Sequence, residues 1–319
     1  MRRAGLTLLA VHSLVFFGGR IAEAEDISGT IDTTKTIFED SQLVGDVTCT
    51  MTDSPCIDFG ASHIRLRLRG FTITGPGNPD IPPEPAIPSA FCNASSGPPV
   101  ADGIRISNQT DSQILGPGMV QRFRRHGILI VGAVGVRTKA KVKLVTSHHN
   151  CFSGLLTNGM SDSVIEDIVS VRNANNSGAA PCGGNCLVNS HDNRIRRNQF
   201  SGNGSGGPPS NDFGVGLLFG SSGNVLEDNS IGGNINGILI HADAVDNVIR
   251  QNVIAGNPPG QVSRIFGAAI GFDVKDESTM VGTGARNSFQ RNWCVTYSGP
   301  GPAPCPNFPG PGDDHDDER

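Results

Sequence analysis

The chain has 319 residues, of which 17% are charged and 37% hydrophobic, and it carries a net charge of −5. A negative net charge argues against nucleic acid as a partner. The 42 glycines and the scarcity of charged residues argue against long helices. With one Trp and one Tyr, the chain is also a poor match for a module that stacks sugars on exposed aromatic rings.

The N-terminus predicts export. Arg2 and Arg3 precede an apolar run from Leu6 to Phe17, and Ala22-Glu23-Ala24 has the small-x-small form that signal peptidases cut. We therefore expect a signal peptide over residues 1–24 and a secreted product, either extracellular or periplasmic. No later apolar run is long enough to span a membrane.

The segment after the first cysteines alternates basic and apolar residues. Arg65, Arg67 and Arg69 alternate with Ile64, Leu66 and Leu68. This alternation predicts a strand whose arginines share one outward face.

Two short motifs then recur along the chain. The first is Gly-apolar-x-apolar, and an Asn or Asp follows its first residue at an offset of eight in several copies. The copies begin at Gly103, Gly127, Gly154, Asn185 (degenerate), Gly216 and Gly237. The second motif places an Asn before and after a short apolar strand. Its copies are Asn193-Ile195-Asn198-Phe200, Asn224-Leu226-Asn229-Ile231, Asn247-Ile249-Asn252-Ile254 and Asn287-Phe289-Asn292-Cys294.

The spacing of the apolar residues predicts strands. They lie two residues apart, so each piece is a short strand with one face inward, and no helix is required. Each repeat of roughly two dozen residues then forms one coil of a solenoid, and every strand pairs with its copy about 4.8 Å along the axis.

These motifs resemble the right-handed parallel β-helix proteins of the pectin lyase-like superfamily. The resemblance covers about residues 30–297, and the segment from Leu43 to Gly75 is similar to the opening coils of secreted bacterial members. It implies an all-β, single-stranded, right-handed parallel β-helix of about nine coils over residues 25–297. It also implies that Asn198, Asn229, Asn252 and Asn292 stack as a ladder.

The resemblance implies two classes of function. One is a secreted protein that acts on or binds extracellular polysaccharide as a lyase, hydrolase or epimerase. The other is a non-catalytic surface, adhesion or structural protein. The pattern is specific for the fold and nearly silent on activity, so the sequence leaves open whether the protein is an enzyme.

The middle residue of each Gly-apolar-x-apolar strand should point outward, which predicts an apolar stripe. In axial order the stripe is Arg105, Leu129, Leu156, Leu187, Leu218 and Leu239. Such a stripe is either covered by other parts of the chain or forms a contact surface, for example in an oligomer. Insertions at 75–100, 174–186, 201–213 and 256–265 should project from one corner beside this face.

Candidate catalytic residues lie in the turns that follow these strands. His191 and Asp192 occupy one turn, and His241 and Asp243 occupy the same turn two coils later. The histidines could act as general acid or base. The aspartates, with Asp246, could orient them or hold a hard cation such as calcium, although Asp is also an ordinary turn residue.

Candidate substrate-binding residues are basic and lie mostly on the second strand of each coil. They could hold an acidic polysaccharide, or they could belong to a solvated face of mixed charge. The set is Arg65, Arg67, Arg105, Lys143, Arg196 and Arg250, with Lys141 and Arg291 nearby.

Eight cysteines in an exported chain predict disulfides. We expect Cys49 to pair with Cys56 and Cys294 to pair with Cys305. The remaining cysteines, Cys92, Cys151, Cys182 and Cys186, should share one corner. A metal cluster there, with His148 or His149, is the alternative interpretation. The Pro- and Gly-rich stretch 298–319 ends in acidic residues and predicts a disordered tail.

Overall fold

The computed structural model describes residues 24–77, 101–173, 183–203, 213–257, 261–262, 269–278 and 287–300. The predicted signal peptide, apart from Ala24, and the tail from residue 301 lie outside these ranges, as do most of the expected insertions. Within the described residues, no helix is long and apolar enough to cross a membrane.

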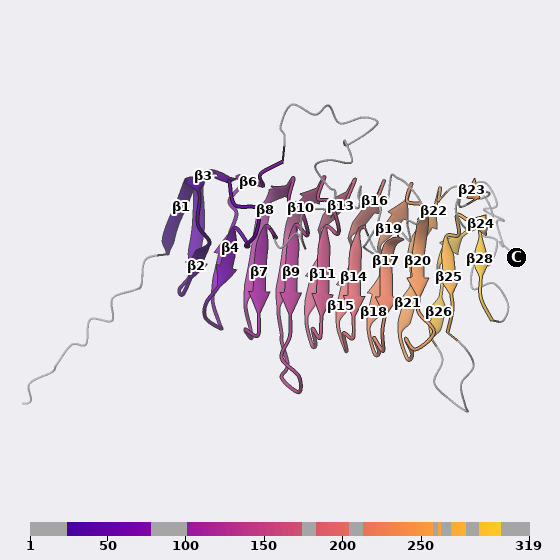
Figure 1. Ribbon diagram of the computed structural model, residues 1–319. Coiled ribbons are helices and arrows are strands. Elements are labelled where there is room, and N and C mark those ends of the chain that lie inside the picture. The colour runs from indigo at the N-terminus through magenta and orange to yellow at the C-terminus, as the bar shows by residue number, and fades with distance from the viewer. Residues whose placement is uncertain are drawn as a thin grey trace, which may run out of the picture.

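Parallel strands stacked side by side form a solenoid (Figure 1). One face is a ten-stranded sheet, called here the first sheet. Its strands are β2 (Lys35–Ile37), β4 (Ile57–Phe59), β7 (Ile104–Ser107), β9 (Ile128–Val131), β11 (Leu155–Asn158), β14 (Asn185–Val188), β17 (Phe213–Leu218), β20 (Asn236–Ile240), β25 (Val274–Asp276) and β28 (Tyr297–Ser298). The Gly-apolar-x-apolar pieces lie in β7, β9, β11, β14, β17 and β20, as predicted.

The other strands form one sixteen-stranded sheet that bends into two faces. The strands of the second sheet follow the first turn of each coil, and those of the third sheet follow the second turn. The second sheet contains β5 (Arg65–Arg67), β12 (Val164–Glu166), β15 (Arg194–Arg196), β18 (Val225–Glu227), β21 (Val248–Arg250) and β26 (Ser288–Gln290). The third contains β6 (Thr72–Thr74), β13 (Val169–Val171), β16 (Gln199–Ser201), β19 (Ser230–Gly232), β22 (Val253–Ala255) and β27 (Trp293–Cys294).

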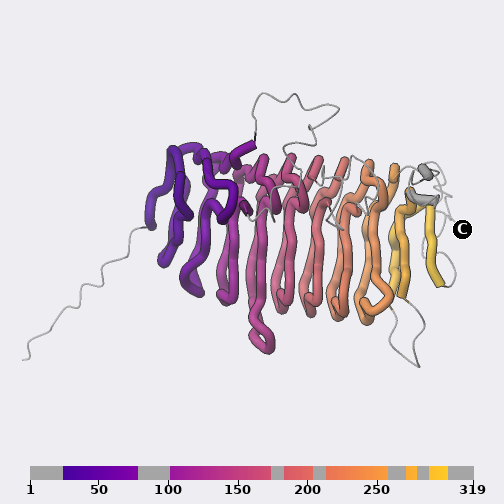
Figure 2. Tube along the Cα trace, viewed as in Figure 1, coloured from indigo at the N-terminus to yellow at the C-terminus, as the bar shows by residue number. Residues whose placement is uncertain are grey.

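Long strands join the second and third sheets at the N-terminal end. They are β3 (Ser41–Cys49), β8 (Gln113–Gln121) and β10 (Lys141–His148), and β1 (Glu25–Ile31) pairs with β3. A separate antiparallel pair, β23 (Gln261–Val262) and β24 (Ala269–Ile270), lies near the C-terminal end. The predicted right-handed parallel β-helix is confirmed. Figure 2 shows its coils side by side, with the turn between β9 and β10 reaching beyond its neighbours.

Apolar side chains fill the interior in rows. Ile165, Ile195, Leu226 and Ile249 occupy equivalent positions in successive coils, and all four are fully buried. Each coil therefore buries its apolar residues against the coils on either side.

Three ladders of buried asparagine pin the turns between sheets. In the predicted ladder, Asn198 donates its backbone N–H and its side-chain Nδ2–H to Asn229 Oδ1, each at 3.0 Å. The Asn198 Nδ2 also donates to the carbonyl of Ile165 at 3.1 Å. The same pattern continues through Asn252 and Asn292. Equivalent ladders form from Asn193, Asn224, Asn247 and Asn287, and from Asn150, Asn173, Asn203 and Asn234.

Glycine begins the first-sheet motif because the corner leaves no room for a side chain. A Cβ at Gly237 would lie 2.3 Å from the carbonyl oxygen of Asp273 and 2.6 Å from Cγ2 of Ile254. The carbonyl belongs to the next coil and the Ile254 side chain to the coil of Gly237 itself, so groups from two coils fill the corner.

The predictions for the cysteines have different outcomes. Cys49 and Cys56 form the expected disulfide, with their Cα atoms 5.8 Å apart. Cys294 is disulfide-bonded, but Cys305 lies outside the described residues, so their pairing stays a prediction. Cys151 and Cys186 are disulfide-bonded as well. The alternative of a cysteine and histidine metal cluster was therefore wrong, because these sulfurs are not available as thiolates.

Candidate functional site

His191 lies in a regular turn position. It belongs to a row of isolated parallel β-bridges between neighbouring coils, which runs from Ser161 through His191 and Ser222 to Val245. Its Nδ1 lies 2.9 Å from the hydroxyl of Ser222 in the next coil. The neighbouring Asp192 is exposed and has a positive φ of 56°, as a turn residue does.

His241 and Asp243 form a closer pair. The His241 Nδ1 lies 2.5 Å from Asp243 Oδ1, and the imidazole also contacts the ring of Phe219, whose centroid is 5.0 Å away. Burial alone would raise the pKa of Asp243. The hydrogen bonds from His241 and from the backbone of Gly220 outweigh burial and lower that pKa. Asp243 therefore accepts as a carboxylate and orients the imidazole.

The structure does not bring the two predicted catalytic pairs together. In the coil of His241, the position equivalent to His191 is Val245. His241 itself directly follows Ile240, which pairs with Leu217. The two histidines thus occupy different rows as well as different coils. In the described part of the chain, no group of three His, Cys, Asp or Glu side chains is placed to hold a metal, and Asp192, Asp243 and Asp246 form no such group. Calcium stays a prediction.

Most of the predicted basic residues share one surface, the outer face of the second sheet. One row of paired positions runs through the β5, β8, β10, β12, β15, β18 and β21 strands. Its residues are Arg67, Leu115, Lys143, Glu166, Arg196, Glu227 and Arg250. Arg65 lies two residues before Arg67 on the same strand. Arg105 lies elsewhere, on the first sheet, where it makes a bidentate ion pair with Asp58 at 2.6 and 2.9 Å.

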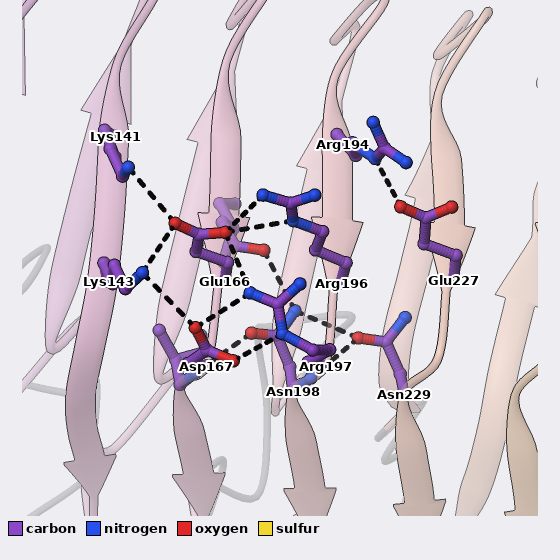
Figure 3. A network of polar contacts seen from close by, with 12 residues as sticks. Lys141, Lys143, Glu166, Asp167, Arg194, Arg196, Arg197, Asn198, Glu227 and Asn229 are labelled. Atoms are coloured by element: carbon purple, nitrogen blue, oxygen red, sulfur yellow. Dashed lines mark hydrogen bonds and ion pairs between the residues drawn. The ribbon is translucent and has the colours of Figure 1, made fainter.

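Glu166 is the centre of this surface (Figure 3). Its side chain is only 2% exposed and lies within 3.2 Å of nitrogens from four cationic side chains. These are Lys141, Lys143, Arg196 and Arg197. Burial raises the pKa of Glu166, but hydrogen bonds from Arg196, Lys141 and Lys143 outweigh it and lower that pKa to about 2. The carboxylate is therefore charged at neutral pH.

The predicted leucine stripe is misplaced in part and is covered. Leu129 pairs with Arg105 and Leu156, but the row continues through Cys186, Gly216 and Leu239. Leu187 points into the core instead, because the degenerate motif at Asn185 shifts the count by one residue. Leu218 lies two residues beyond Gly216, which is the member of that row on its strand, and pairs with Val188.

The outer apolar residues of the first sheet belong to a second buried cluster. Cys186, Phe213, Leu218 and Leu239 form it, and all are 7% exposed or less. Leu129 is buried as well. The stripe is thus covered within the chain, which leaves little apolar surface there for the oligomer contact considered from the sequence.

A group that the sequence did not assemble lies where the third sheet ends. β10 ends at His148, whose Nδ1 is 2.5 Å from Nδ1 of His149. The Nε2 of His148 is 2.8 Å from the sulfur of Met119 in β8. Nε2 of His149 is buried without a hydrogen-bond partner. All three residues are half-buried.

Burial and nearby arginines keep these histidines neutral. Burial and, to a smaller extent, the charges of His149, Arg122 and Arg172 together lower the pKa of His148 to about 4. Burial also lowers the pKa of His149, again with help from Arg172 and Arg122. Met119 was missed from the sequence because it lies one coil away. The repeat register, which pairs Met119 with Thr146, would have placed it beside His148.

Comparison with known families identifies the family to which the chain belongs. The family described as periplasmic copper-binding protein (NosD) matches residues 91–292. The chain belongs to the NosD family. The description of the family as periplasmic agrees with the export predicted from the N-terminus. No curated protein matches the sequence.

Solved structures match the chain at low similarity. The A-module of mannuronan C-5 epimerase AlgE4 from Azotobacter vinelandii is 11% identical, with a TM-score of 0.41 over 86% of this chain and 85% of that one. Pectate lyase Pel9A is 12% identical, with a TM-score of 0.39 over 84% and 79% of the two chains. At this similarity, neither structure says what this NosD-family chain binds or catalyses.

Proposed function

We propose that this protein binds copper through His148, His149 and Met119. The observation that carries the proposal is that His148 contacts both other side chains on the outer side of the third sheet. Its Nδ1 lies 2.5 Å from Nδ1 of His149, and its Nε2 lies 2.8 Å from the sulfur of Met119. The family description names copper, and these three side chains supply the ligand types that copper takes.

The group fits the chemistry of a soft metal site. Imidazole nitrogen and thioether sulfur both bind copper, and the thioether favours the +1 state. The buried Nε2 of His149 lacks a hydrogen-bond partner, which is costly for a polar atom unless something else satisfies it. A metal-binding role explains why the fold keeps that atom.

Charge also favours a singly charged ion. The lowered pKa values leave both histidines neutral at pH 7, so no proton has to be displaced before a metal binds. Arg122 and Arg172 act electrostatically on both imidazoles. Their positive charge opposes a divalent ion more strongly than Cu(I). The site would hold and shield copper, and the side chains present supply binding without an evident reaction.

The test is an anaerobic Cu(I) titration of the mature protein in competition with a chromogenic Cu(I) chelator. We compare the wild type with Met119→Leu, which conserves volume, and His149→Asn, which suits the positive φ of 54° at that position. Each variant should weaken the tightest Cu(I) site by more than about tenfold.

The matched control removes an exposed histidine far from the group. His63 is 72% exposed and also has a positive φ, so His63→Asn is equivalent in chemistry and backbone. Its Cu(I) affinity should equal that of the wild type. Unchanged affinity in both Met119→Leu and His149→Asn would overturn the proposal.

Activity on an extracellular polysaccharide is a second candidate, favoured by the His241 and Asp243 pair. An imidazole oriented by a carboxylate and 34% exposed has the form of a general base. The mature protein should be incubated with a panel of acidic and neutral polysaccharides while unsaturated products and reducing ends are followed together. His241→Ala should abolish any turnover; equal turnover in that variant would exclude this pair.

A further inference from the structure

The outer face of the second sheet carries cations at a regular interval. In the row that includes Glu166, cationic residues occupy every second rung, and the rungs between them hold Leu115, Glu166 and Glu227. The cations are Arg67, Lys143, Arg196 and Arg250. Because strands in a sheet are about 4.8 Å apart, successive cations in this row are separated by roughly 10 Å along the axis.

A second outward row repeats the pattern two residues earlier on each strand. Arg65, Lys141 and Arg194 again occupy alternate rungs, with Gln113 and Val164 between them. We call these seven residues of the two rows the cation stripe. The rows themselves contain two carboxylates, Glu166 and Glu227, so cations are in excess.

The carboxylates lie beneath the cations. Glu166 and Glu227 are 2% and 5% exposed, whereas the paired cations of the stripe are between 30% and 47% exposed. Arg65 is exposed as well. Two partners outside the rows are more exposed: Asp40, which pairs with Arg67, is 37% exposed, and Asp167, which pairs with Lys143, is 25% exposed. The seven cations outnumber these two carboxylates, so the surface that a ligand meets is positive, even though most of the cations are ion-paired (Figure 3).

The buried carboxylates hold the arginines in place and leave donors available. Arg196 and Arg250 each use Nε and Nη2 on a glutamate. A guanidinium has five N–H donors, so each of these side chains can still donate to a ligand. Fixing the side chains beforehand lowers the entropy cost of binding.

Acidic residues limit the stripe on both sides. Asp167 and Asp228 lie in the turn that follows the second sheet, and Asp162, Asp192 and Asp246 lie in the turn that precedes it. The excess of cations is thus a narrow band that runs along the axis across several coils. Such a band matches an extended chain of negative charges better than a compact anion.

We infer that the cation stripe binds a linear acidic polysaccharide lying along the solenoid axis. The ligand is a polymer of uronate type, whose carboxylates meet the exposed ammonium and guanidinium groups. The stripe shares no residue with the copper group or with His241 and Asp243. Its binding is therefore independent of both.

The test measures binding of polygalacturonate to the full-length mature protein by isothermal titration calorimetry, with dextran as the neutral polymer. The test variant is Arg194→Gln, in the stripe, combined with Arg197→Gln, which directly follows the stripe residue Arg196 at the end of β15. Glutamine already occupies the equivalent positions in other coils, at Gln113 and Gln251. Glu166, Asp167 and Glu227 each keep a cationic partner in this variant.

The control variant removes two ion-paired cations elsewhere. Lys35 pairs with Glu25 and Lys275 pairs with Glu277, and both lysines lie on the first sheet. Lys35→Gln with Lys275→Gln therefore changes the net charge equally without touching the stripe. We expect the test variant to bind polygalacturonate about three- to tenfold more weakly and the control to match the wild type.

The salt dependence of the binding affinity is a second test of the same interaction. Binding should weaken from low salt to about 0.15 M, because exposed charges are screened, and dextran should not bind. Equal affinity for dextran, equal losses in the two double variants, or no loss in either of them would overturn the inference.

Discussion

Two carboxyl groups with almost equally small exposed areas have pKa values shifted in opposite directions. Glu166, on the second sheet, is 2% exposed, and Asp102, just before the first sheet, is 1% exposed. The pKa of Glu166 is lowered to about 2, whereas that of Asp102 is raised to about 6. Burial therefore does not by itself decide the state of a buried acid in this fold.

Two features explain the difference: Asp102 lies deeper in the protein than Glu166, so burial raises its pKa more strongly, and fewer cations surround it. Burial raises both pKa values, but Glu166 is held by four cations. Asp102 has Arg125 at 3.7 Å and one backbone N–H, from His126, at 3.2 Å, and its Oδ2 accepts no hydrogen bond. A buried acid stays charged here when neighbouring coils surround it with cations, and it becomes a weak acid when they do not.

The largest effect should come from breaking the asparagine ladder that supports the strand of Glu166, where Asn198 bonds to the carbonyl of Ile165 and to Asn229. Asn229→Ala removes the acceptor of the Asn198 backbone N–H and the donor to the Ile195 carbonyl. Each is a buried group, so the free energy of unfolding should fall by about 3–6 kcal/mol. Urea unfolding followed by circular dichroism measures the change.

An exposed asparagine supplies the control for the ladder. Asn158 lies at the end of β11 and is exposed. Asn158→Ala should change the free energy of unfolding by less than about 0.5 kcal/mol. Similar losses in the two variants would show that stacking of asparagine contributes nothing special.

The next largest effect on stability should come from removing the buried carboxylate of the second sheet. Glu166→Gln removes the carboxylate that holds four cations, and should lower the free energy of unfolding by about 1–3 kcal/mol at pH 7. Because the folded pKa is about 2, below the ordinary value of 4.5, the stabilisation is complete above 4.5 and is lost as pH falls toward 2. The gap between wild type and variant, measured by melting temperature at several pH values, should close over that interval.

Asp102 should respond with the opposite sign. Its folded pKa of about 6 lies above the ordinary value of 3.8, so its contribution to stability is most favourable below 3.8 and is lost as pH rises through 6. Asp102→Asn should therefore raise the free energy of unfolding at pH 8 by about 1–2 kcal/mol and change it little at pH 4. A loss of stability at pH 8 would mean that the charged carboxylate is favoured, contrary to this account.

The interior of the fold could be predicted from the sequence because stacking forces one residue type to recur. Asn198, Asn229 and Asn252 recur because each must bond to its copies, and this is visible as spacing. Outward-facing residues do not have to bond to their copies in neighbouring coils. The count along the degenerate copy at Asn185 therefore slipped by one, and Leu187 was assigned to the wrong side.

The candidate sites were harder to predict because they join residues from different coils. The basic face was visible in Arg65 and Arg67, but the burial of Glu166 beneath its cations depends on exact register. Met119 and His148 come from neighbouring coils and meet only when strands are aligned. Asp102 looks like an ordinary turn residue until its burial is known.

The smallest effect concerns the cation that is ion-paired with Asp102. Arg125→Gln removes a guanidinium that is 34% exposed and 3.7 Å from the carboxylate. The charged form loses a favourable partner, so the pKa of Asp102 should rise further. Because solvent screens a partly exposed pair, stability at pH 8 should fall by no more than about 1 kcal/mol, with no change at pH 4, where the carboxyl is protonated. Carbon-detected NMR titration of the Asp102 carboxyl in the wild type and the variant measures the shift, and an unchanged pKa would mean that the number of nearby cations does not set the difference between Asp102 and Glu166.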